Sequence, residues 1–322
     1  MKITILDDYQ HIIEKLNCFD LLKGQHVEIL HETEKDPGKL ASLISDTEIL
    51  VLTRERTEIT NELLSKLPRL KLISQTGKIS NHLDLGACTK HHVAVAEGVG
   101  SAIAPAELTW ALLMNTARQI PQAIEAMKQG KWQINIGTTI HGKTLGIWGY
   151  GKIGQKMAQY AKVFGAKVMV WGSENSRKKA VEDGFEQAET KDHFFKKADI
   201  ITLHLRLSDQ TFGIIKETDL LNMKENSVLI NTARAELIEK GGLQNVLKSG
   251  KNIFVGVDVY EHEPVYDTNF ELLKMENLVC TPHLGYVEKN GYELYFGKAF
   301  ENVVNYINGN PTNIANPETL NK

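Results

Sequence analysis

Short apolar runs alternate with amphipathic stretches along the first part of the chain. The runs that predict strands are Ile3–Leu6, Val27–Leu30, Ile49–Thr53, Leu70–Ser74 and Val93–Ala96. Between them, Thr60–Leu67 has a helical pattern, in which Thr60 is a suitable N-cap and Glu62 lies in the first turn. Strands that alternate with helices in this way predict a parallel sheet with helices on its faces.

The same alternation restarts after a long helical stretch, which is predicted over Ala104–Gln129 and ends at Gly130. The later apolar runs predict strands at Thr144–Trp148, Lys167–Trp171, Ile200–Leu205, Ser227–Asn231, Ile253–Val257 and Leu278–Cys280. A helix is predicted over Lys152–Phe164, and a last helix over about Val287–Asn308. This second set of elements forms a complete doubly wound unit inside the chain.

The two sets of strands predict two α/β domains. One runs over residues 1–98 and is completed by residues 288–322, and the other spans residues 99–287. A chain of 322 residues is long enough to build two cores. The two long helices then connect the domains and leave a cleft between them, and clefts of that kind are common ligand sites.

Charge and composition narrow the classes of partner. The net charge is −3, from 37 basic and 40 acidic residues, which leaves no electrostatic footprint for nucleic acid or an anionic membrane. Cys18, Cys88 and Cys280 lie far apart and form no CxxC pair, so we expect no disulfide framework and no metal site. The start of the chain, MKITILDDYQ, lacks the apolar region of a signal peptide, and no run is long enough to span a membrane. These features predict a cytoplasmic protein.

A glycine-rich sequence joins a predicted strand to a predicted helix. It consists of Gly149, Tyr150, Gly151, Lys152, Ile153 and Gly154. Gly149 permits a tight turn, Gly151 lets the backbone approach a pyrophosphate, and Gly154 lets helix and strand pack closely. The free N–H groups at the helix N-terminus suit phosphate groups. A glycine turn without a ligand is the alternative, but the order of strand, loop, helix and next strand favours a dinucleotide site.

The end of the following strand bears on which dinucleotide fits. An acid that binds the adenosine ribose is expected there, but the position holds Gly172. Glu174, two residues later, would take this role and favour NAD. Ser173, Asn175 and Arg177 would instead receive a 2′-phosphate and favour NADP, unless Arg177 and Lys178 only begin a solvated helix. We expect NAD, with NADP as the alternative.

Three polar segments follow the last three predicted strands, and they contain Arg234, Glu263 and His283. Doubly wound folds bind ligands at the carboxyl ends of their strands, so these side chains are expected to converge. A guanidinium binds a carboxylate, an imidazole exchanges a proton near neutral pH, and a carboxylate favours the protonated imidazole. With a nicotinamide as hydride carrier, the set suits interconversion of a 2-oxo and a 2-hydroxy acid. Each residue taken singly has a structural alternative, but their joint placement favours catalysis.

At these segments the chain resembles the D-isomer-specific 2-hydroxyacid dehydrogenase family, over nearly its whole length. LGIWGYGKIG is similar to the family's cofactor loop, MKENSVLINTARAELIE to its arginine segment, VGVDVYEHEP to its glutamate segment and NLVCTPHLGY to its histidine segment. Among members, the chain is most similar to short D-3-phosphoglycerate dehydrogenase-like proteins, and it ends too soon for their longer relatives' regulatory domain. The resemblance implies two Rossmann-like domains, an NAD(P)-dependent oxidoreductase acting on the CH–OH group of a small D-2-hydroxy acid, and a homodimer built on the cofactor domain.

The resemblance assigns further residues to binding. It implies that Asp258 contacts the nicotinamide amide. The other residues that it places at the cofactor are His204, Leu205, Arg206, Thr232, Ala233 and Gly285. In the first domain, Ser74–Lys78 is similar to a loop whose backbone N–H groups hold the substrate carboxylate, which places Thr76, Gly77 and Lys78 at the substrate.

The identity of the small acid stays open among 3-phosphoglycerate, hydroxypyruvate and glyoxylate. Arg54 and Lys78 would bind a second anionic group, unless they are surface charges. Gln75 stands where phosphoglycerate enzymes of the family have an arginine that contacts phosphate, which weakens the phosphoglycerate interpretation. The second hypothesis is a corepressor-like binding protein of the same fold, which uses nicotinamide to control dimerisation and partner recruitment.

Overall fold

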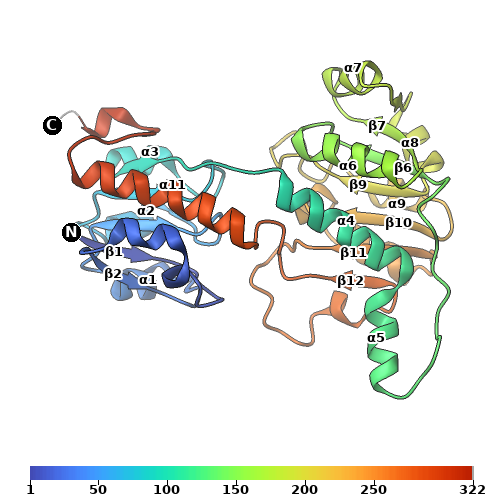
Figure 1. Cartoon of the computed structure of the whole chain (residues 1–322), viewed down its shortest axis with the longest axis horizontal. Coiled ribbons are helices and arrows are strands. Elements are labelled where there is room, and N and C mark those ends of the chain that lie inside the picture. Colours follow the sequence, from blue (N-terminus) through green and yellow to red (C-terminus); the bar gives the residue numbers. More distant parts are fainter. Residues whose placement is uncertain (321–322) are drawn as a thin grey trace. The chain divides into compact units, whose positions relative to one another are not determined.

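The computed structural model of the protein describes residues 1–320, which form two compact units. The first unit consists of Met1–Ser101 and of the chain from Glu288 onward, and the second is the continuous segment Ala102–Val287. Each unit is built on its own parallel sheet (Figure 1). Among residues 1–320, no helix combines the length and the apolar character needed to cross a lipid bilayer.

The first unit has a five-stranded sheet in the order β2-β1-β3-β4-β5. Its strands are β1 (Lys2–Ile5), β2 (His26–Ile29), β3 (Ile49–Leu52), β4 (Leu72–Gln75) and β5 (Ala94–Ala96). Its helices are α1 (Pro37–Leu43), α2 (Asn61–Ser65), α3 (Leu85–Lys90) and α11 (Lys289–Ile307). The C-terminal helix α11 packs on β4, where the Ser74 hydroxyl donates to the Ala299 carbonyl at 2.8 Å. The last part of the chain therefore completes the core of the first unit.

The short helices of this unit begin at side chains that satisfy their free N–H groups. Thr60 accepts a hydrogen bond from the Leu63 N–H at the start of α2, so the N-cap expected from the sequence is confirmed. Asp36 and Asp84 cap α1 and α3 in the same way. These caps fix where each of the three helices begins.

The second unit has a seven-stranded sheet in the order β12-β11-β10-β9-β6-β7-β8. Its strands are β6 (Thr144–Trp148), β7 (Lys167–Trp171), β8 (Glu186–Gln187), β9 (Ile200–Leu203), β10 (Ser227–Asn231), β11 (Ile253–Val257) and β12 (Leu278–Cys280). Its helices are α4 (Ile103–Arg118), α5 (Ile120–Lys128), α6 (Lys152–Val163), α7 (Glu174–Glu182), α8 (Lys191–Lys197), α9 (Glu217–Leu221) and α10 (Gly242–Lys248). The order reverses between β6 and β9, and ligands of doubly wound folds bind at such a point.

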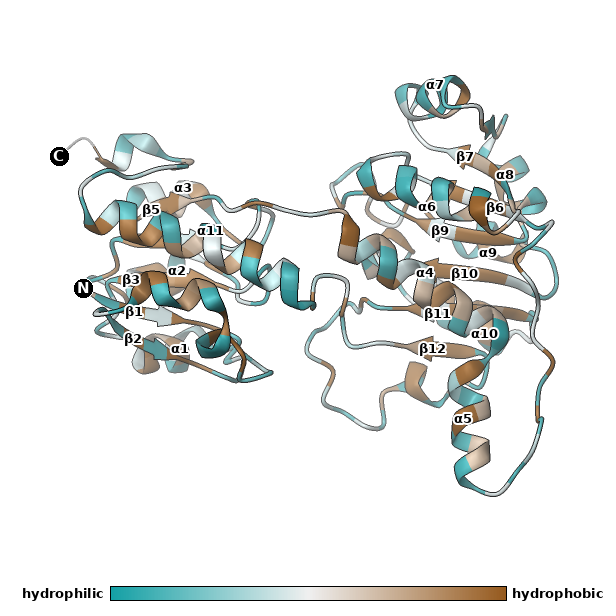
Figure 2. Cartoon of the chain, viewed as in Figure 1, coloured by the Kyte–Doolittle hydropathy of each residue, from teal (hydrophilic) through white to brown (hydrophobic). Residues whose placement is uncertain are grey.

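Helices cover both faces of this second sheet. Leu229 of β10 packs in a buried cluster with Phe194 and Leu203, whereas its neighbour Ile230 packs in another cluster with Met157. Burial on both faces explains why the strands read as continuous apolar runs, which Figure 2 shows as brown arrows among more polar helices. The predicted α/β fold with doubly wound sheets is confirmed.

The helical stretch expected over Ala104–Gln129 is not continuous. It is two helices, α4 and α5, which are separated by Gln119 in the left-handed conformation (φ 51°). Pro121 is the physical reason, because its ring has no N–H and clashes with the preceding helical turn. The prediction of one helix was wrong, since the hydrophobic pattern alone does not register a break of a single residue.

The strand β8 was not expected either. It consists of the exposed residues Glu186 and Gln187, which pair with Met169 and Val170 of β7. Two exposed polar residues carry no hydrophobic signal, so only backbone pairing with β7 makes this segment a strand.

Candidate active site

The glycine turn between β6 and α6 has the shape of a dinucleotide-binding loop. Gly149 has a φ of +102°, and a Cβ on it would stand 2.7 Å from the His204 carbonyl oxygen. A Cβ on Gly154 would stand 2.1 Å from the Gly149 carbonyl oxygen, so helix and strand approach too closely for a side chain. At Gly151, by contrast, no atom of the described residues outside the adjoining backbone lies within 4 Å of the Cβ position. This open position at the N-terminus of α6 fits the pyrophosphate of NAD.

The residues expected to meet the adenosine ribose lie at the start of α7. Ser173 caps the helix, and Glu174 forms an exposed ion pair with Lys178 at 2.7 Å. The Arg177 guanidinium lies over the Trp171 ring, 4.8 Å from its centroid. Glu174 thus pairs along its own helix and Arg177 stacks on β7, and their contacts with a cofactor stay predictions.

Two of the other cofactor candidates have side chains that are hydrogen-bonded to other residues of the second unit. Tyr150 is buried, and its hydroxyl donates to Asp183 at 3.0 Å, so this residue offers a ligand its backbone. The Nε2 of His204 lies 3.1 Å from the Thr202 hydroxyl. Burial lowers the pKa of His204 to about 3, so its imidazole is neutral at physiological pH.

The remaining cofactor candidates lie at the carboxyl ends of neighbouring strands. Lys152 and Ile153 open α6, Leu205 and Arg206 follow β9, Thr232 and Ala233 follow β10, Asp258 follows β11, and Gly285 follows β12. Because these strands are neighbours in one parallel sheet, the structure brings all of these residues to one edge, at and beside the β6/β9 reversal.

Arg234 is set by a tight turn after β10. The buried Asn231 accepts a hydrogen bond from the Ala233 N–H at 3.1 Å, and its amide donates to the Arg234 carbonyl at 2.8 Å. The guanidinium Nη1 donates to the Ala233 carbonyl at 2.7 Å. The turn therefore holds a permanently charged, planar donor at the ligand edge of the sheet.

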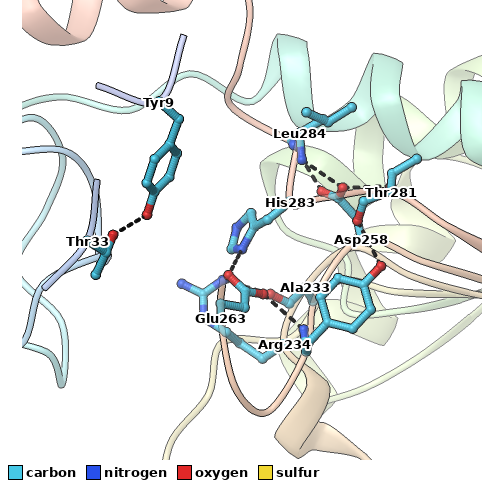
Figure 3. Close-up of polar contacts among 11 residues, drawn as sticks. Tyr9, Thr33, Ala233, Arg234, Asp258, Glu263, Thr281, His283 and Leu284 are labelled. Atoms are coloured by element: carbon cyan, nitrogen blue, oxygen red, sulfur yellow. Dashed lines mark hydrogen bonds and ion pairs between the residues drawn. The ribbon is translucent and has the colours of Figure 1, made fainter. Parts of the chain in front are cut away.

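His283 and Glu263 form the expected pair. The His283 Nδ1 lies 2.6 Å from the Glu263 Oε2 (Figure 3), and the other carboxylate oxygen accepts the Tyr260 N–H at 2.9 Å. The Tyr286 ring lies edge-on to the imidazole, with the ring centroids 5.7 Å apart. The carboxylate thus fixes the tautomer and the orientation of the histidine.

Asp258 builds the loop that carries this histidine. It is almost completely buried, and its carboxylate accepts hydrogen bonds from the Thr281 hydroxyl (2.7 Å) and from the N–H groups of Leu284 (2.7 Å) and Gly285 (2.9 Å). Burial raises the pKa of Asp258, and these hydrogen bonds oppose that effect. The loop needs this support because His283 has a φ of 52°, a left-handed conformation.

The family resemblance placed Asp258 at the cofactor amide, and the sequence analysis missed this role in the loop. Its partners lie more than twenty residues further along the chain, in the segment after β12. The available signal was weak: an acidic residue directly after a buried strand. Its contact with the nicotinamide stays a prediction.

The substrate candidates of the first unit are arranged around Arg54. This residue follows β3 with a φ of 54°, its N–H donates to the Thr76 hydroxyl at 2.8 Å, and its carbonyl accepts the Gln75 amide at 2.8 Å. A Cβ on Gly77 would stand 2.2 Å from the Arg54 Nη1, so the guanidinium lies directly over that glycine. It also lies over the ring of Tyr295, 5.4 Å from the centroid.

Lys78 is not part of this arrangement. Its ammonium group pairs with Glu97 at 2.8 Å, and the other oxygen of that carboxylate accepts the Ile79 N–H at 3.1 Å. The structure therefore groups Arg54, Thr76 and Gly77 and turns Lys78 toward an acid of its own unit.

Comparison with known proteins shows which protein family the chain resembles. The model of the D-isomer specific 2-hydroxyacid dehydrogenase NAD-binding domain matches residues 110–285. D-3-phosphoglycerate dehydrogenase from Methanocaldococcus jannaschii is 34% identical over 84% of this chain, which spans only 53% of that protein. Glyoxylate reductase from Thermococcus litoralis is 33% identical over 91% of this chain and 93% of its own length. The solved phosphoglycerate oxidoreductase from Vibrio cholerae is 50% identical, with a TM-score of 0.94 over 96% of this chain and 99% of that one.

These findings confirm the predicted family resemblance, the nicotinamide cofactor as NAD, and oxidoreductase chemistry on 2-hydroxy acids at the level of the family. None of these relatives is named a corepressor, so the second hypothesis gains no support from them. The chain belongs to the D-isomer specific 2-hydroxyacid dehydrogenase family, and residues 110–285 form its NAD-binding domain.

Proposed function

We propose that this protein interconverts a small 2-oxo acid and the corresponding D-2-hydroxy acid with NADH and NAD. The observation that carries the proposal is the pair formed by His283 and Glu263, 2.6 Å apart at the ligand edge of the NAD-binding sheet. The nicotinamide, when bound, supplies or takes up the hydride. Side chains of the protein bind the substrate and transfer the proton.

His283 is the proton donor and acceptor in this proposal. Its Nδ1 is held by Glu263, so Nε2 is the nitrogen that gives a proton to the forming alkoxide and takes it back in the oxidation. The Tyr260 N–H holds the carboxylate in turn, which keeps the imidazole oriented. Arg234 binds the substrate carboxylate through its planar fork of donors.

Replacement of His283 tests this assignment. In His283→Ala we expect kcat for 2-oxo acid reduction to fall by about 10²–10⁴-fold, because general acid catalysis is lost. The NADH dissociation constant should stay near the wild-type value, since the glycine turn is untouched. His262→Ala, which removes an exposed histidine of the neighbouring loop, is the matched control and should keep full turnover.

Two results would contradict the proposal in different ways. Normal turnover of His283→Ala would remove this residue from the mechanism. Failure of the wild-type protein to reduce any 2-oxo acid from a panel of glyoxylate, pyruvate, hydroxypyruvate and 3-phosphohydroxypyruvate would overturn the function itself.

We propose a small, unphosphorylated acid as the substrate. A phosphate dianion calls for more than one cation, but Lys78 is paired with Glu97 and the neighbouring Gln75 is neutral. Of Arg54, Gln75 and Lys78, Arg54 is the residue whose guanidinium lies over the substrate loop, at Gly77. Hydroxypyruvate or glyoxylate should accordingly give a higher kcat/KM than 3-phosphohydroxypyruvate.

We also propose a homodimer built on the second unit. The helix α5, which extends beyond the sheet in Figure 1, and the segment after it expose several large apolar side chains. Among them, Trp132 is 75% exposed and Ile136 is 94% exposed. A second copy of the chain is the occupant that hides this surface. Ile136→Asp should shift the protein toward monomer in analytical ultracentrifugation, and an unchanged sedimentation coefficient would contradict the proposal.

A cytoplasmic location is the remaining proposal. Cys18, Cys88 and Cys280 are all free thiols, as is typical of proteins in a reducing compartment. Fractionation of the source cells would check it, and recovery in an exported fraction would contradict it.

A further inference from the structure

Tyr260 links the two loops that carry the catalytic pair of the second unit. Glu263 lies in the loop after β11, and His283 lies in the loop after β12. The Tyr260 N–H donates to the Glu263 Oε1 at 2.9 Å, and the Tyr260 hydroxyl donates to the Thr281 carbonyl at 3.0 Å. Any residue except proline would supply the N–H, whereas the second bond needs the hydroxyl of this side chain.

The direction of the bond from the Tyr260 hydroxyl is fixed. A backbone carbonyl oxygen carries no proton, so Thr281 can only accept. Burial raises the pKa of Tyr260, and neighbouring acidic groups add to that effect. The phenol therefore keeps its proton at physiological pH and acts as the donor.

The Thr281 carbonyl also holds the backbone of the catalytic histidine. It accepts the His283 N–H at 2.9 Å, across Pro282. A carbonyl oxygen has two lone pairs, so it accepts this bond and the bond from Tyr260 together. The anchor matters because His283 has a left-handed backbone, with a φ of 52°. The Tyr260 hydroxyl thus acts on the point from which the chain enters this turn.

Four hydrogen bonds close a ring around the catalytic pair. They run from Tyr260 to Glu263, from Glu263 to His283, from His283 to Thr281, and from Thr281 back to Tyr260. The ring includes the 2.6 Å contact between Glu263 and His283, which leaves little room for the two loops to move apart. Asp258 adds its own hydrogen bonds to the histidine loop, so this loop stays folded when the ring is opened.

We propose that Tyr260 is a positioning residue for the catalytic pair, and that its hydroxyl sets the place of the His283 imidazole against Glu263. The inference rests on the proposed function and adds the residue that fixes its geometry. Proton transfer depends on such placement, because a displaced general acid no longer lies within hydrogen-bond reach of the reacting oxygen. The glycine turn and Arg234 lie on other loops, so the effect should appear in kcat.

Tyr260→Phe tests the proposal, because it removes the hydroxyl and keeps the ring and the backbone N–H. We expect kcat to fall about tenfold, the effect of one lost hydrogen bond, while KM and the NADH dissociation constant stay near the wild-type values. The melting temperature should fall by no more than about 4 °C. Tyr266→Phe, at a tyrosine of the same segment that is 71% exposed, is the matched control and should keep the wild-type kcat.

Proton NMR reports the geometry of the pair without turnover. The proton between the His283 Nδ1 and Glu263 should give a resonance far downfield of the amide region, because the bond is short and charge-assisted. His283→Ala assigns this resonance by removing it. In Tyr260→Phe the resonance should move upfield or broaden through exchange with water, whereas in Tyr266→Phe it should not change.

Phe270→Leu separates the hydroxyl of Tyr260 from the packing of its ring. The Phe270 ring lies edge-on to that of Tyr260, with the centroids 5.8 Å apart. This variant should lower the melting temperature, because it removes packing from the neighbouring core. It should leave kcat and the downfield resonance near the wild-type values, since the hydroxyl is still present.

The outcomes separate the inference from the proposed function. A wild-type kcat and an unchanged resonance in Tyr260→Phe would overturn the role of Tyr260, and so would equal losses of kcat in Tyr260→Phe and Phe270→Leu. A wild-type protein without the downfield resonance would contradict the short contact on which the inference depends. Absence of turnover on any 2-oxo acid, with a resonance that still responds to Tyr260→Phe, would overturn the proposed function and keep the positioning of the pair.

Discussion

Alanine at each glycine of the cofactor turn should separate folding from NAD binding. The three positions share one loop, but their surroundings differ. The missing Cβ would meet a backbone oxygen at 2.7 Å on Gly149 and at 2.1 Å on Gly154, and would meet open space on Gly151. We therefore expect two variants to lose stability and one to lose mainly affinity.

The expected losses of folding stability follow from the geometry at each glycine. Gly154→Ala forces a backbone shift, because a carbonyl oxygen cannot turn aside as a flexible side chain can, and this should lower the free energy of unfolding by about 3 kcal/mol. Gly149→Ala adds a strained φ of +102° to a close contact and should lose a similar amount. Gly151→Ala keeps an ordinary φ of −80° at the N-cap of α6, so the loss should stay below about 1 kcal/mol.

The expected effect of Gly151→Ala is on the cofactor. A methyl group in the open space would displace a phosphate from one charge-assisted hydrogen bond of about 1.5–3 kcal/mol, which raises the NADH dissociation constant roughly 10- to 100-fold. Urea unfolding without cofactor measures the stabilities, and NADH fluorescence titration measures the affinity. Wild-type affinity in Gly151→Ala, or a loss of stability as large as in Gly154→Ala, would refute the reasoning.

Three other perturbations have defined outcomes. Asp258→Asn leaves a buried N–H of the histidine loop without an acceptor, so it should lower the free energy of unfolding by about 2 kcal/mol and also lower kcat. Urea unfolding and steady-state assays measure the two effects, and unchanged values in both would contradict the role of Asp258 in building the loop. His204 stays neutral in the folded state down to a pKa of about 3 but takes up a proton near pH 6.5 when unfolded. Stability is therefore lost as pH falls below 6.5, and between pH 7 and 5 the wild type should lose about 2 kcal/mol more than His204→Asn, whereas parallel pH curves would exclude this residue. Gly77→Ala pushes the Arg54 guanidinium aside and should raise the substrate KM roughly tenfold without changing the melting temperature. Gly100→Ala, which has open space around its Cβ position, is the control. An unchanged KM in Gly77→Ala would remove Arg54 from the substrate site.

The α/β class and most of the helices and strands could be predicted from the sequence. Buried parallel strands appear as unbroken apolar runs, and caps such as Thr60 act through hydrogen bonds three residues away, so both signals are local. The glycine turn could be predicted for the same reason, because all of its residues lie in one short segment. Arg234, Glu263 and His283 could be predicted as one group because each follows a strand end, and parallel strands bring such ends to one edge of the sheet.

The hydrogen bonds that hold the site's side chains in place could not be predicted from the sequence. Asp258 supports the loop of His283 from a neighbouring strand, and Asp7 meets Thr33 and Thr57 from two other loops. Partners so far apart in the chain share no pattern of spacing, and only the packing of the sheet fixes their distance. The physical reason is that hydrophobic periodicity specifies which face of an element is buried, whereas the direction of a buried hydrogen bond depends on every donor and acceptor that folding brings within reach.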